Sequence, residues 1–345
     1  MDNYLGILTG GGDCPGLNAV IRAVVRRAMR ENIRVMGIYS GWQGLIDGNI
    51  KPLTRYSVAG IQYKGGTILG TSRCDPLADD ESLQKIRDNW RNFGINSLIV
   101  VGGNGTLSSS MRMWRDEGVP IVGVCKTIDN DIYGTDYTFG FDTAVSIATE
   151  AIDRLHTTAE AHHRVMVVEV MGRHSGWIAT YAGIAGGADL ILIPEKPFRI
   201  SEVCDLLQKR KEMGRNFSIV VVAEDARPHP EEDYLTEEQK ERIFREERLG
   251  GIGDIVGRWI EERTGLSARV TVLGYIQRGG SPTAFDRVLA TRLGVKAVEM
   301  VMAGEFGRMA AINGLQMISV ALEEVAAKSK PIDADIYRTA EIFFG

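Results

Sequence analysis

Four residues within a six-residue stretch could do chemistry together, namely Lys126, Thr127, Asp129 and Asp131. They follow residues 121–125, a short apolar run rich in β-branched side chains, which is typical of a buried strand. A lysine can neutralise a phosphate, one carboxylate can accept a hydroxyl proton, and a second can bind Mg²⁺. Phosphoryl transfer uses this combination of groups.

The residue types alone leave a structural interpretation open. Aspartates that follow a strand commonly cap a turn, and Lys126 could be a solvent-facing side chain, although it ends an apolar strand. The ends of the other apolar runs favour chemistry, because they are rich in glycine and in basic side chains. These strand-end residues are Gly11, Gly12, Arg73, Gly103, Asn104, Gly105, Met171, Gly172, Arg173, Glu224 and Arg278. Glycine N–H groups and arginine side chains both bind phosphate oxygens.

The apolar runs that must position these residues alternate with segments of helical periodicity. The expected strands are residues 4–9, 34–39, 97–101, 121–125, 165–170, 190–193, 218–223 and 270–275. Alternation of this kind predicts an α/β protein with mostly parallel sheets covered by helices on both faces. Two such sheets fit the 345 residues of the chain.

Composition narrows the class of protein. A net charge of −5 gives no basic field for nucleic acid, and no stretch approaches the ~20 apolar residues of a membrane span. The N-terminus has no signal-peptide pattern, and the four cysteines have no paired spacing, so we expect reduced thiols in a cytoplasmic protein. The charged residues 226–250 are interpreted as a solvated helical excursion, and His162, His163 and His174 as structural or exposed.

Five segments together resemble the phosphofructokinase family, and the resemblance extends along nearly the whole chain. They are residues 10–18, 126–131, 134–138, 168–173 and 276–282. The resemblance implies two Rossmann-like, three-layer domains with the active site in the cleft between them. Residues 1–141 with about 282–313 would form a phosphoryl-donor domain, and residues 142–281 with about 314–345 a sugar-phosphate domain.

The family's functional residues are carried over by position. Asp129 would accept the proton of the C1 hydroxyl of fructose 6-phosphate, while Arg73 and Lys126 would neutralise the transferring group. The implied sugar-phosphate residues are Thr127, Asp129, Arg164, Met171, Gly172, Arg173, Glu224, Arg269, Tyr275 and Arg278, with Arg164 and Arg269 supplied by a neighbouring subunit. The implied donor residues are Gly12, Arg73, Cys74, Gly103, Asn104, Gly105 and Thr106, and the implied Mg²⁺ ligands are Asn104 and Asp131.

Departures from the family pattern bear on the phosphoryl donor. Asn104 stands where ATP-using members usually carry an aspartate, so Asp131 would carry more of the Mg²⁺. Gly105 stands where pyrophosphate users place an aspartate, and it leaves room for the α-phosphate of ATP. Lys126, however, is shared with pyrophosphate users.

The basic residues of the family's allosteric site are only partly present. Arg22, Arg26 and Arg55 match them and Glu195 matches the acidic one, but His156 replaces an arginine. The lysine pair expected near 214–217 is also missing, so we predict weak or no allosteric regulation.

The predicted function is ATP-dependent phosphorylation of fructose 6-phosphate in glycolysis by a homodimer or homotetramer. Pyrophosphate is the alternative donor. A NAD or lipid kinase and a non-catalytic sugar-phosphate-binding subunit are further alternatives. The sugar motifs at 171–173 and 277–280 argue against the first, and the retained Asp129, Lys126 and Arg73 against the second.

Overall fold

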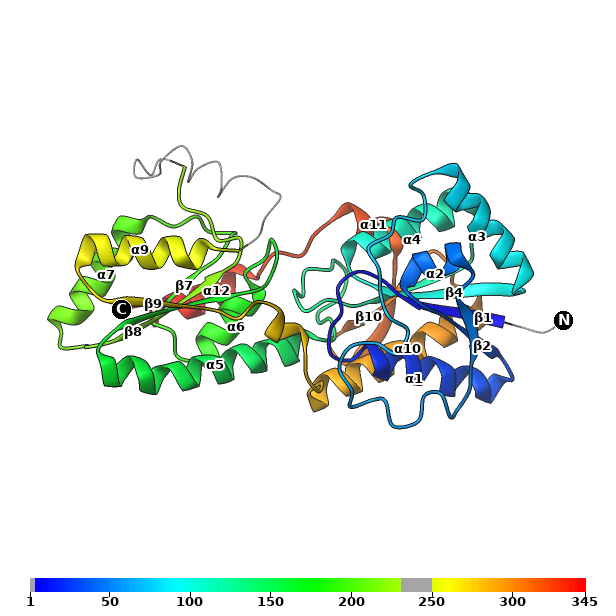
Figure 1. Cartoon of the computed structure of the whole chain (residues 1–345), viewed down its shortest axis with the longest axis horizontal. Helices are drawn as coiled ribbons and strands as arrows, with labels where there is room; N and C mark the ends of the chain where they lie inside the picture. Colours follow the sequence, from blue (N-terminus) through cyan, green and yellow to red (C-terminus); the bar gives the residue numbers. More distant parts are fainter. Residues whose placement is uncertain (1–3, 231–249) are drawn as a thin grey trace. The chain divides into compact units, whose positions relative to one another are not determined.

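The computed structural model describes residues 4–230 and 250–345, so most of the predicted charged excursion, residues 231–249, lies outside the described residues. The chain forms two compact units. Unit 1 comprises Met1–Thr143 and Arg278–Lys330, and unit 2 comprises Ala144–Gln277 and Pro331–Gly345. Each unit is an α/β arrangement of a central sheet between helical layers, which confirms the predicted fold class (Figure 1).

Unit 1 is built on a sheet with the strand order β11-β10-β5-β4-β1-β2-β3. The strands are β1 (Tyr4–Thr9), β2 (Arg34–Ile38), β3 (Ile50–Leu53), β4 (Ile95–Gly102), β5 (Ile121–Cys125), β10 (Arg308–Asn313) and β11 (Gln316–Ala321). The five inner strands pair in parallel, and β3 and β11 pair antiparallel at the two edges. Because helices cover both faces, the central strands β1, β4 and β5 are mostly apolar and almost fully buried.

The helices of unit 1 are α1 (Leu17–Ala28), α2 (Gly41–Asp47), α3 (Asp80–Asn92), α4 (Asn104–Glu117), α10 (Ala284–Ala303) and α11 (Leu322–Ala327), with the 3-10 helix η1 (Met29–Glu31). α1 packs on α10 on one face of the sheet, and α4 packs on α11 on the other (Figure 1). The glycine turns after β1 and β4 each lead directly into a helix, as expected.

Unit 2 contains a fully parallel sheet with the strand order β7-β8-β6-β9. Its strands are β6 (Val165–Val170), β7 (Leu190–Leu192), β8 (Ser218–Ala223) and β9 (Ala268–Val272). Its helices are α5 (Phe141–His162), whose first turn belongs to unit 1, α6 (Trp177–Ala185), α7 (Ile200–Glu212), α9 (Ile252–Thr264) and α12 (Ala334–Glu341), with the 3-10 helix η2 (Gly274–Arg278) at its boundary. α5 and α6 cover one face, and α7 and α9 the other (Figure 1).

The chain passes between the units after Thr143, Gln277 and Lys330. The first two positions lie close to the expected boundaries. The third lies after Lys330 rather than near residue 313, because β11 pairs with β10 and α11 packs on α4 within unit 1.

The first crossing point is held by a buried carboxylate on α10. Oδ2 of Asp286 accepts hydrogen bonds from the backbone N–H of Thr143 at 2.8 Å and from its Oγ1 at 2.5 Å. Oγ1 of Thr143 in turn accepts the N–H of Thr283 at 3.0 Å. Burial raises the pKa of Asp286 from 3.8 to about 6, although the bonds from Thr143 act in the opposite direction.

This raised pKa predicts a pH-dependent cost to folding. Because the folded state favours the protonated acid, Asp286 stabilises the fold fully below pH 3.8, and that contribution is lost as the pH rises to about 6. Asp286→Asn is neutral at every pH and retains an oxygen for Thr143. Between pH 4 and 7, the unfolding free energy of the wild type relative to this variant should therefore fall by on the order of 3 kcal/mol.

Urea denaturation across this pH range measures the difference. Asp80→Asn, an exposed carboxylate on α3, is the control and should follow the wild-type profile. A constant difference between the wild type and Asp286→Asn would contradict the prediction.

Candidate functional site

The glycine turn after β1 and the turn after β4 lie against each other in unit 1. The N–H of Gly10 donates to the carbonyl of Val101 at 2.9 Å. The side chain of Thr106 fills the space between the two turns, so a Cβ would come within 2.7 Å of it at Gly10 and within 2.4 Å at Gly102. Glycine at these positions is therefore required for the close approach of the two loops.

Helix α4 begins at the second turn with an open N-terminus. Its N-cap residue, Gly103, makes no side-chain capping bond, so the first N–H groups of the helix remain available to an anion. Gly105 is exposed, and a Cβ built there meets nothing within 4 Å. The site therefore combines an anion-binding helix end with free space beside it.

Two cations reach the first glycine turn. Lys126, only 3% exposed, donates from Nζ to the carbonyl of Gly12. Arg278 donates from Nη1 to the carbonyl of Asp13 at 3.3 Å, and a Cβ on Gly12 would lie 2.9 Å from that nitrogen. Burial lowers the pKa of Lys126, and the charge of Arg278 adds to this effect. Because the turn is electropositive and both cations are held by carbonyls, the arrangement suits a phosphate.

The loop after β5 carries the predicted base. Asp129 is 6% exposed, and its Oδ2 accepts a hydrogen bond from Oγ1 of Thr127 at 3.0 Å. The N–H of Asp129 donates back to the same hydroxyl at 3.1 Å. This reciprocal pair fixes the direction of the Asp129 carboxylate.

The two predicted Mg²⁺ ligands also lie together. Nδ2 of Asn104 donates a hydrogen bond to Oδ2 of Asp131 at 2.7 Å. The described residues contain no group of three or more His, Cys, Asp or Glu side chains that could hold a metal ion. One carboxylate and one amide oxygen nevertheless fit Mg²⁺, which is commonly held by one or two carboxylates together with substrate phosphates.

Arg73 and Cys74 belong to a segment tied to the first glycine turn. The N–H of Gly11 donates to the carbonyl of Ser72 at 2.9 Å, and Oγ1 of Thr71 donates to the carbonyl of Gly11 at 2.6 Å. Arg73 itself is exposed. Burial raises the pKa of Cys74, so its thiol is a neutral neighbour of the turn rather than a charged one.

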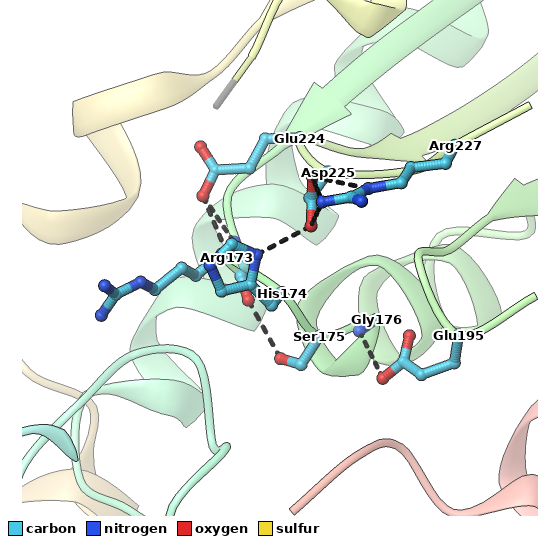
Figure 2. A network of polar contacts seen from close by, with 9 residues as sticks. Arg173, His174, Ser175, Gly176, Glu195, Glu224, Asp225 and Arg227 are labelled. Atoms are coloured by element: carbon cyan, nitrogen blue, oxygen red, sulfur yellow. Dashed lines mark hydrogen bonds and ion pairs between the residues drawn. The ribbon is translucent and has the colours of Figure 1, made fainter. Parts of the chain in front are cut away.

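The loop after β6 in unit 2 contains Met171, Gly172 and Arg173 and is shaped by Glu224 (Figure 2). Oε1 of Glu224 accepts the N–H of Arg173 at 2.8 Å and that of Gly172 at 3.3 Å. Gly172 and Arg173 have φ values of 151° and 53°, and a Cβ on Gly172 would lie 2.5 Å from the carbonyl of Ser175. The carboxylate therefore stabilises a strained loop that places Arg173 in solvent.

Two further contacts hold this loop, and both join residues that are distant in the chain. The buried Gln277 accepts the N–H of Met171 at 2.8 Å through Oε1. Nδ1 of His174 lies 2.8 Å from Oδ2 of Asp225, and Asp225 also forms an ion pair with Arg227 (Figure 2). Gln277 lies in the motif at 276–282, whereas the sequence analysis did not predict the pair of His174 with Asp225.

Comparisons with known proteins now bear on this site. The sequence pattern of the family described as Phosphofructokinase matches residues 4–301. The chain belongs to the phosphofructokinase family. The resemblance and the predicted class of enzyme, a phosphotransferase with an alcohol acceptor, are thereby confirmed.

Relatives of this phosphofructokinase carry two different names. A pyrophosphate–fructose 6-phosphate 1-phosphotransferase from Streptomyces coelicolor is 51% identical over 342 residues, and an ATP-dependent 6-phosphofructokinase 2 from the same organism is 50% identical over 343. Each alignment covers 99% of both chains. The names leave the donor of this phosphofructokinase open.

Solved structures agree with the fold. The pyrophosphate-dependent phosphofructokinase of Nitrosospira multiformis has a TM-score of 0.84 at 20% identity, with 100% of this chain and 92% of that chain covered. The phosphofructokinase of Saccharomyces cerevisiae has a TM-score of 0.81 at 33% identity, with 94% of this chain covered. The chain spans 45% of the length of that yeast chain.

Arg164 and Arg269 lie far from the 171–173 loop, which contains other predicted sugar-phosphate residues of unit 2. Arg164 directly precedes β6 and Arg269 pairs with Met166 near the start of β9, whereas Met171 follows the end of β6. A six-residue strand spans about 20 Å, so these arginines lie near the starts of β6 and β9, and Met171 lies at the opposite end of β6. Arg269 also pairs with Glu261 at 3.1 Å. One chain of this phosphofructokinase therefore does not bring its two arginines to its own 171–173 loop.

Tyr275, the remaining predicted sugar-phosphate residue of unit 2, is 77% exposed. Its neighbour Ile276 is exposed as well. Within unit 2, the hydroxyl of Tyr275 is therefore free to meet a ligand.

A hollow of about 460 Å³ in unit 2 includes His156, which stands where the family resemblance implies an arginine. It is lined by His156, Glu160, His163, Asp189, Arg210, 214–217, Phe343 and Gly345. Two acidic residues, Glu160 and Asp189, line this hollow. Oε1 of Glu195 accepts the N–H of Gly176 at 3.0 Å (Figure 2). It also accepts the N–H of Ile332 at 3.0 Å.

No helix in residues 4–230 and 250–345 is long and apolar enough to cross a membrane.

Proposed function

We propose that the protein is a 6-phosphofructokinase that transfers the γ-phosphoryl group of ATP to the C1 hydroxyl of fructose 6-phosphate. The observation that carries this proposal is the arrangement of unit 1. A buried carboxylate, Asp129, follows the same strand as the buried cation Lys126, and Lys126 contacts a glycine turn of the phosphate-binding type.

Each of these residues has one role in the transfer step. Asp129 accepts the C1 hydroxyl proton as the C1 oxygen forms its bond to the γ-phosphorus. The bond from the γ-phosphorus to the β,γ-bridging oxygen breaks, so ADP leaves with the electron pair and the products are fructose 1,6-bisphosphate and ADP. Lys126 and Arg73 neutralise the oxygens of the transferring group, and the first N–H groups of α4 bind the donor phosphates. Thr127 holds Asp129 in the direction needed for the proton transfer.

Asn104 and Asp131 would hold Mg²⁺ together with the phosphates of the donor. When bound, the ion supplies charge neutralisation on the β- and γ-phosphate oxygens. Since Asn104 is neutral, Asp131 is the only charged protein ligand in this proposal, and its position depends on the hydrogen bond from Asn104.

The free space at Gly105 favours ATP over pyrophosphate. Pyrophosphate ends at its second phosphate, so it does not need room beyond it, whereas the α-phosphate and nucleoside of ATP do. Pyrophosphate is the second candidate, and the buried Lys126 and the name of the 51% identical relative favour it. A NAD or lipid kinase does not account for the strained loop at 171–173, and a subunit that only binds sugar phosphate does not account for the fixed carboxylate of Asp129.

Self-association is part of the proposal. Because Arg164 and Arg269 lie at the opposite end of the strands from the 171–173 loop, a second copy of the chain would supply them to the 6-phosphate. The enzyme would act in this form in glycolysis in the cytoplasm.

One assay of product formation tests the donor. The protein is incubated with fructose 6-phosphate and Mg²⁺, with ATP or pyrophosphate alone and then with both together. We expect kcat/KM for ATP to exceed that for pyrophosphate by at least about tenfold, equivalent to 1.4 kcal/mol in transition-state binding. A preference for pyrophosphate would make pyrophosphate, not ATP, the donor. Activity on NAD without activity on fructose 6-phosphate would overturn the whole proposal.

A further inference from the structure

Lys330, the last residue of unit 1, uses all three of its ammonium donors inside the protein. Its Nζ lies 2.8 Å from the carbonyl of Thr135, 2.8 Å from the carbonyl of Asp136 and 3.1 Å from Oδ1 of Asn130. A lysine ammonium has three N–H donors, so these contacts satisfy it completely. The ammonium group of Lys330 therefore donates all three of its hydrogen bonds to the loop after β5, and none is left for a substrate.

The backbone next to Lys330 joins the same loop. The N–H of Lys330 donates to the carbonyl of Asp131 at 3.0 Å, and Ser329 forms an antiparallel bridge with Ile132. The segment thus pairs with the loop as a short extra strand, and the ammonium group closes over the turn that follows.

A continuous set of hydrogen bonds leads from Lys330 to Asp129. Oδ1 of Asn130, the acceptor for Lys330, also accepts the N–H of Thr138 at 3.0 Å. Oγ1 of Thr138 donates to the carbonyl of Thr127 at 2.8 Å, and the hydroxyl of Thr127 donates to Asp129.

Asn130 and Thr138 are fully buried, and Asn130 has a φ of 52°. A residue other than glycine is held at a positive φ by the structure around it. The contacts of Asn130 are the ones that hold it here, and Lys330 supplies one of them.

We propose that Lys330 is a positioning residue for phosphoryl transfer, because its ammonium group holds the loop that aims the carboxylate of Asp129 at the acceptor hydroxyl. The inference rests on the proposed function, since it assigns Asp129 as the base. Neither the motifs nor the strand-end pattern contains Lys330, which lies 201 residues from Asp129 in the chain (330 − 129).

The test compares Lys330→Met with Lys328→Met at pH 7. Burial lowers the pKa of Lys330 to about 8, so the wild-type side chain is mostly charged at that pH. Lys328 is the matched control, since it lies two residues earlier and contacts the outside of the same loop through the ring of Tyr133, 4.6 Å away. It is exposed and makes none of the contacts to Asn130, Thr135 or Asp136.

We expect Lys330→Met to lower kcat by about tenfold to a hundredfold, the range that small misplacements of reacting groups cause. Its KM for fructose 6-phosphate should change by less than about threefold, because the lost interaction acts in the transition state. Lys328→Met should retain the wild-type kcat. Equal kcat values for folded Lys330→Met and the wild type, or equal losses in both variants, would overturn the proposal.

Amide hydrogen exchange provides a readout that needs no activity. Residues 127–138 should exchange faster in Lys330→Met than in the wild type, whereas Lys328→Met should match the wild type. Unchanged exchange in Lys330→Met would contradict the positioning role. If Lys330→Met does not fold, Lys330→Gln retains a shorter neutral donor, and the same criteria apply to it.

The two proposals fail separately. Absence of activity on fructose 6-phosphate with either donor would overturn the proposed function, and hydrogen exchange would then decide whether Lys330 holds the loop. Normal wild-type activity with a normal kcat in folded Lys330→Met would overturn only the role of Lys330.

Discussion

Asp129→Asn is expected to lower kcat by roughly 10²–10⁴-fold or more, the range typical of lost acid–base catalysis. Asparagine has nearly the same shape as aspartate and can keep the hydrogen bond with Thr127, so the loop should stay in place. It cannot accept the proton of the C1 hydroxyl. The loss should therefore appear in kcat, with a much smaller change in the KM for fructose 6-phosphate.

Asp136→Asn is the matched control for this variant. It makes the same change seven residues later in the chain (136 − 129), at an exposed carboxylate whose Oδ2 accepts the N–H of Gly314 at 2.6 Å. Asparagine keeps an oxygen for that bond, so activity should stay near the wild-type value. Steady-state kinetics of both variants decide the matter, and Asp129→Asn with more than about a tenth of the wild-type kcat would remove Asp129 as the base.

The second large effect concerns the donor. Gly105→Asp should lower kcat/KM for ATP by about 10²-fold or more, because a carboxylate beside the α-phosphate places like charges together at a cost of several kcal/mol. The fold should tolerate this change. A Cβ at Gly105 meets nothing within 4 Å, and an acidic side chain in the first turn of α4 interacts favourably with the helix dipole.

The same variant should retain much more of any pyrophosphate-dependent activity, since pyrophosphate has no α-phosphate that the new carboxylate would repel. The measurement is the ratio of kcat/KM for the two donors, compared between the wild type and Gly105→Asp. Gly118→Asp is unsuitable as a control because Gly118 has a φ of 67°, whereas Ser108→Asp, one turn further along α4, introduces the same charge away from the helix end. An unchanged donor ratio in Gly105→Asp would show that this position does not select the donor.

Local patterns in the sequence predicted the parts of the site that belong to single strand ends. Lys126, Thr127 and Asp129 follow one buried run, so their proximity needed only the strand and the turn after it. The glycines at 10–12 and 102–105 were found in the same way, because a strand, a glycine turn and a helix are contiguous in the chain.

Contacts between residues distant in the chain left no such pattern. The resemblance implied that Glu224 lines the sugar, but no local pattern indicated that its carboxylate binds backbone N–H groups of residues 51 and 52 positions earlier. Lys330 meets Asn130 across 200 residues, and β11 joins the sheet of unit 1 through β10. Each depends on tertiary packing, so single-sequence periodicity does not report it.

The discontinuity of unit 1 has a consequence for synthesis on the ribosome. Residues 144–277 are contiguous and contain the whole sheet of unit 2, so this sheet can form as soon as they have emerged. Strand β5, in contrast, waits for its neighbour β10, which is made only after all of unit 2's first segment. During that interval β5 is an apolar edge strand without its neighbour. Nascent chains aggregate through such strands, and chaperones bind them.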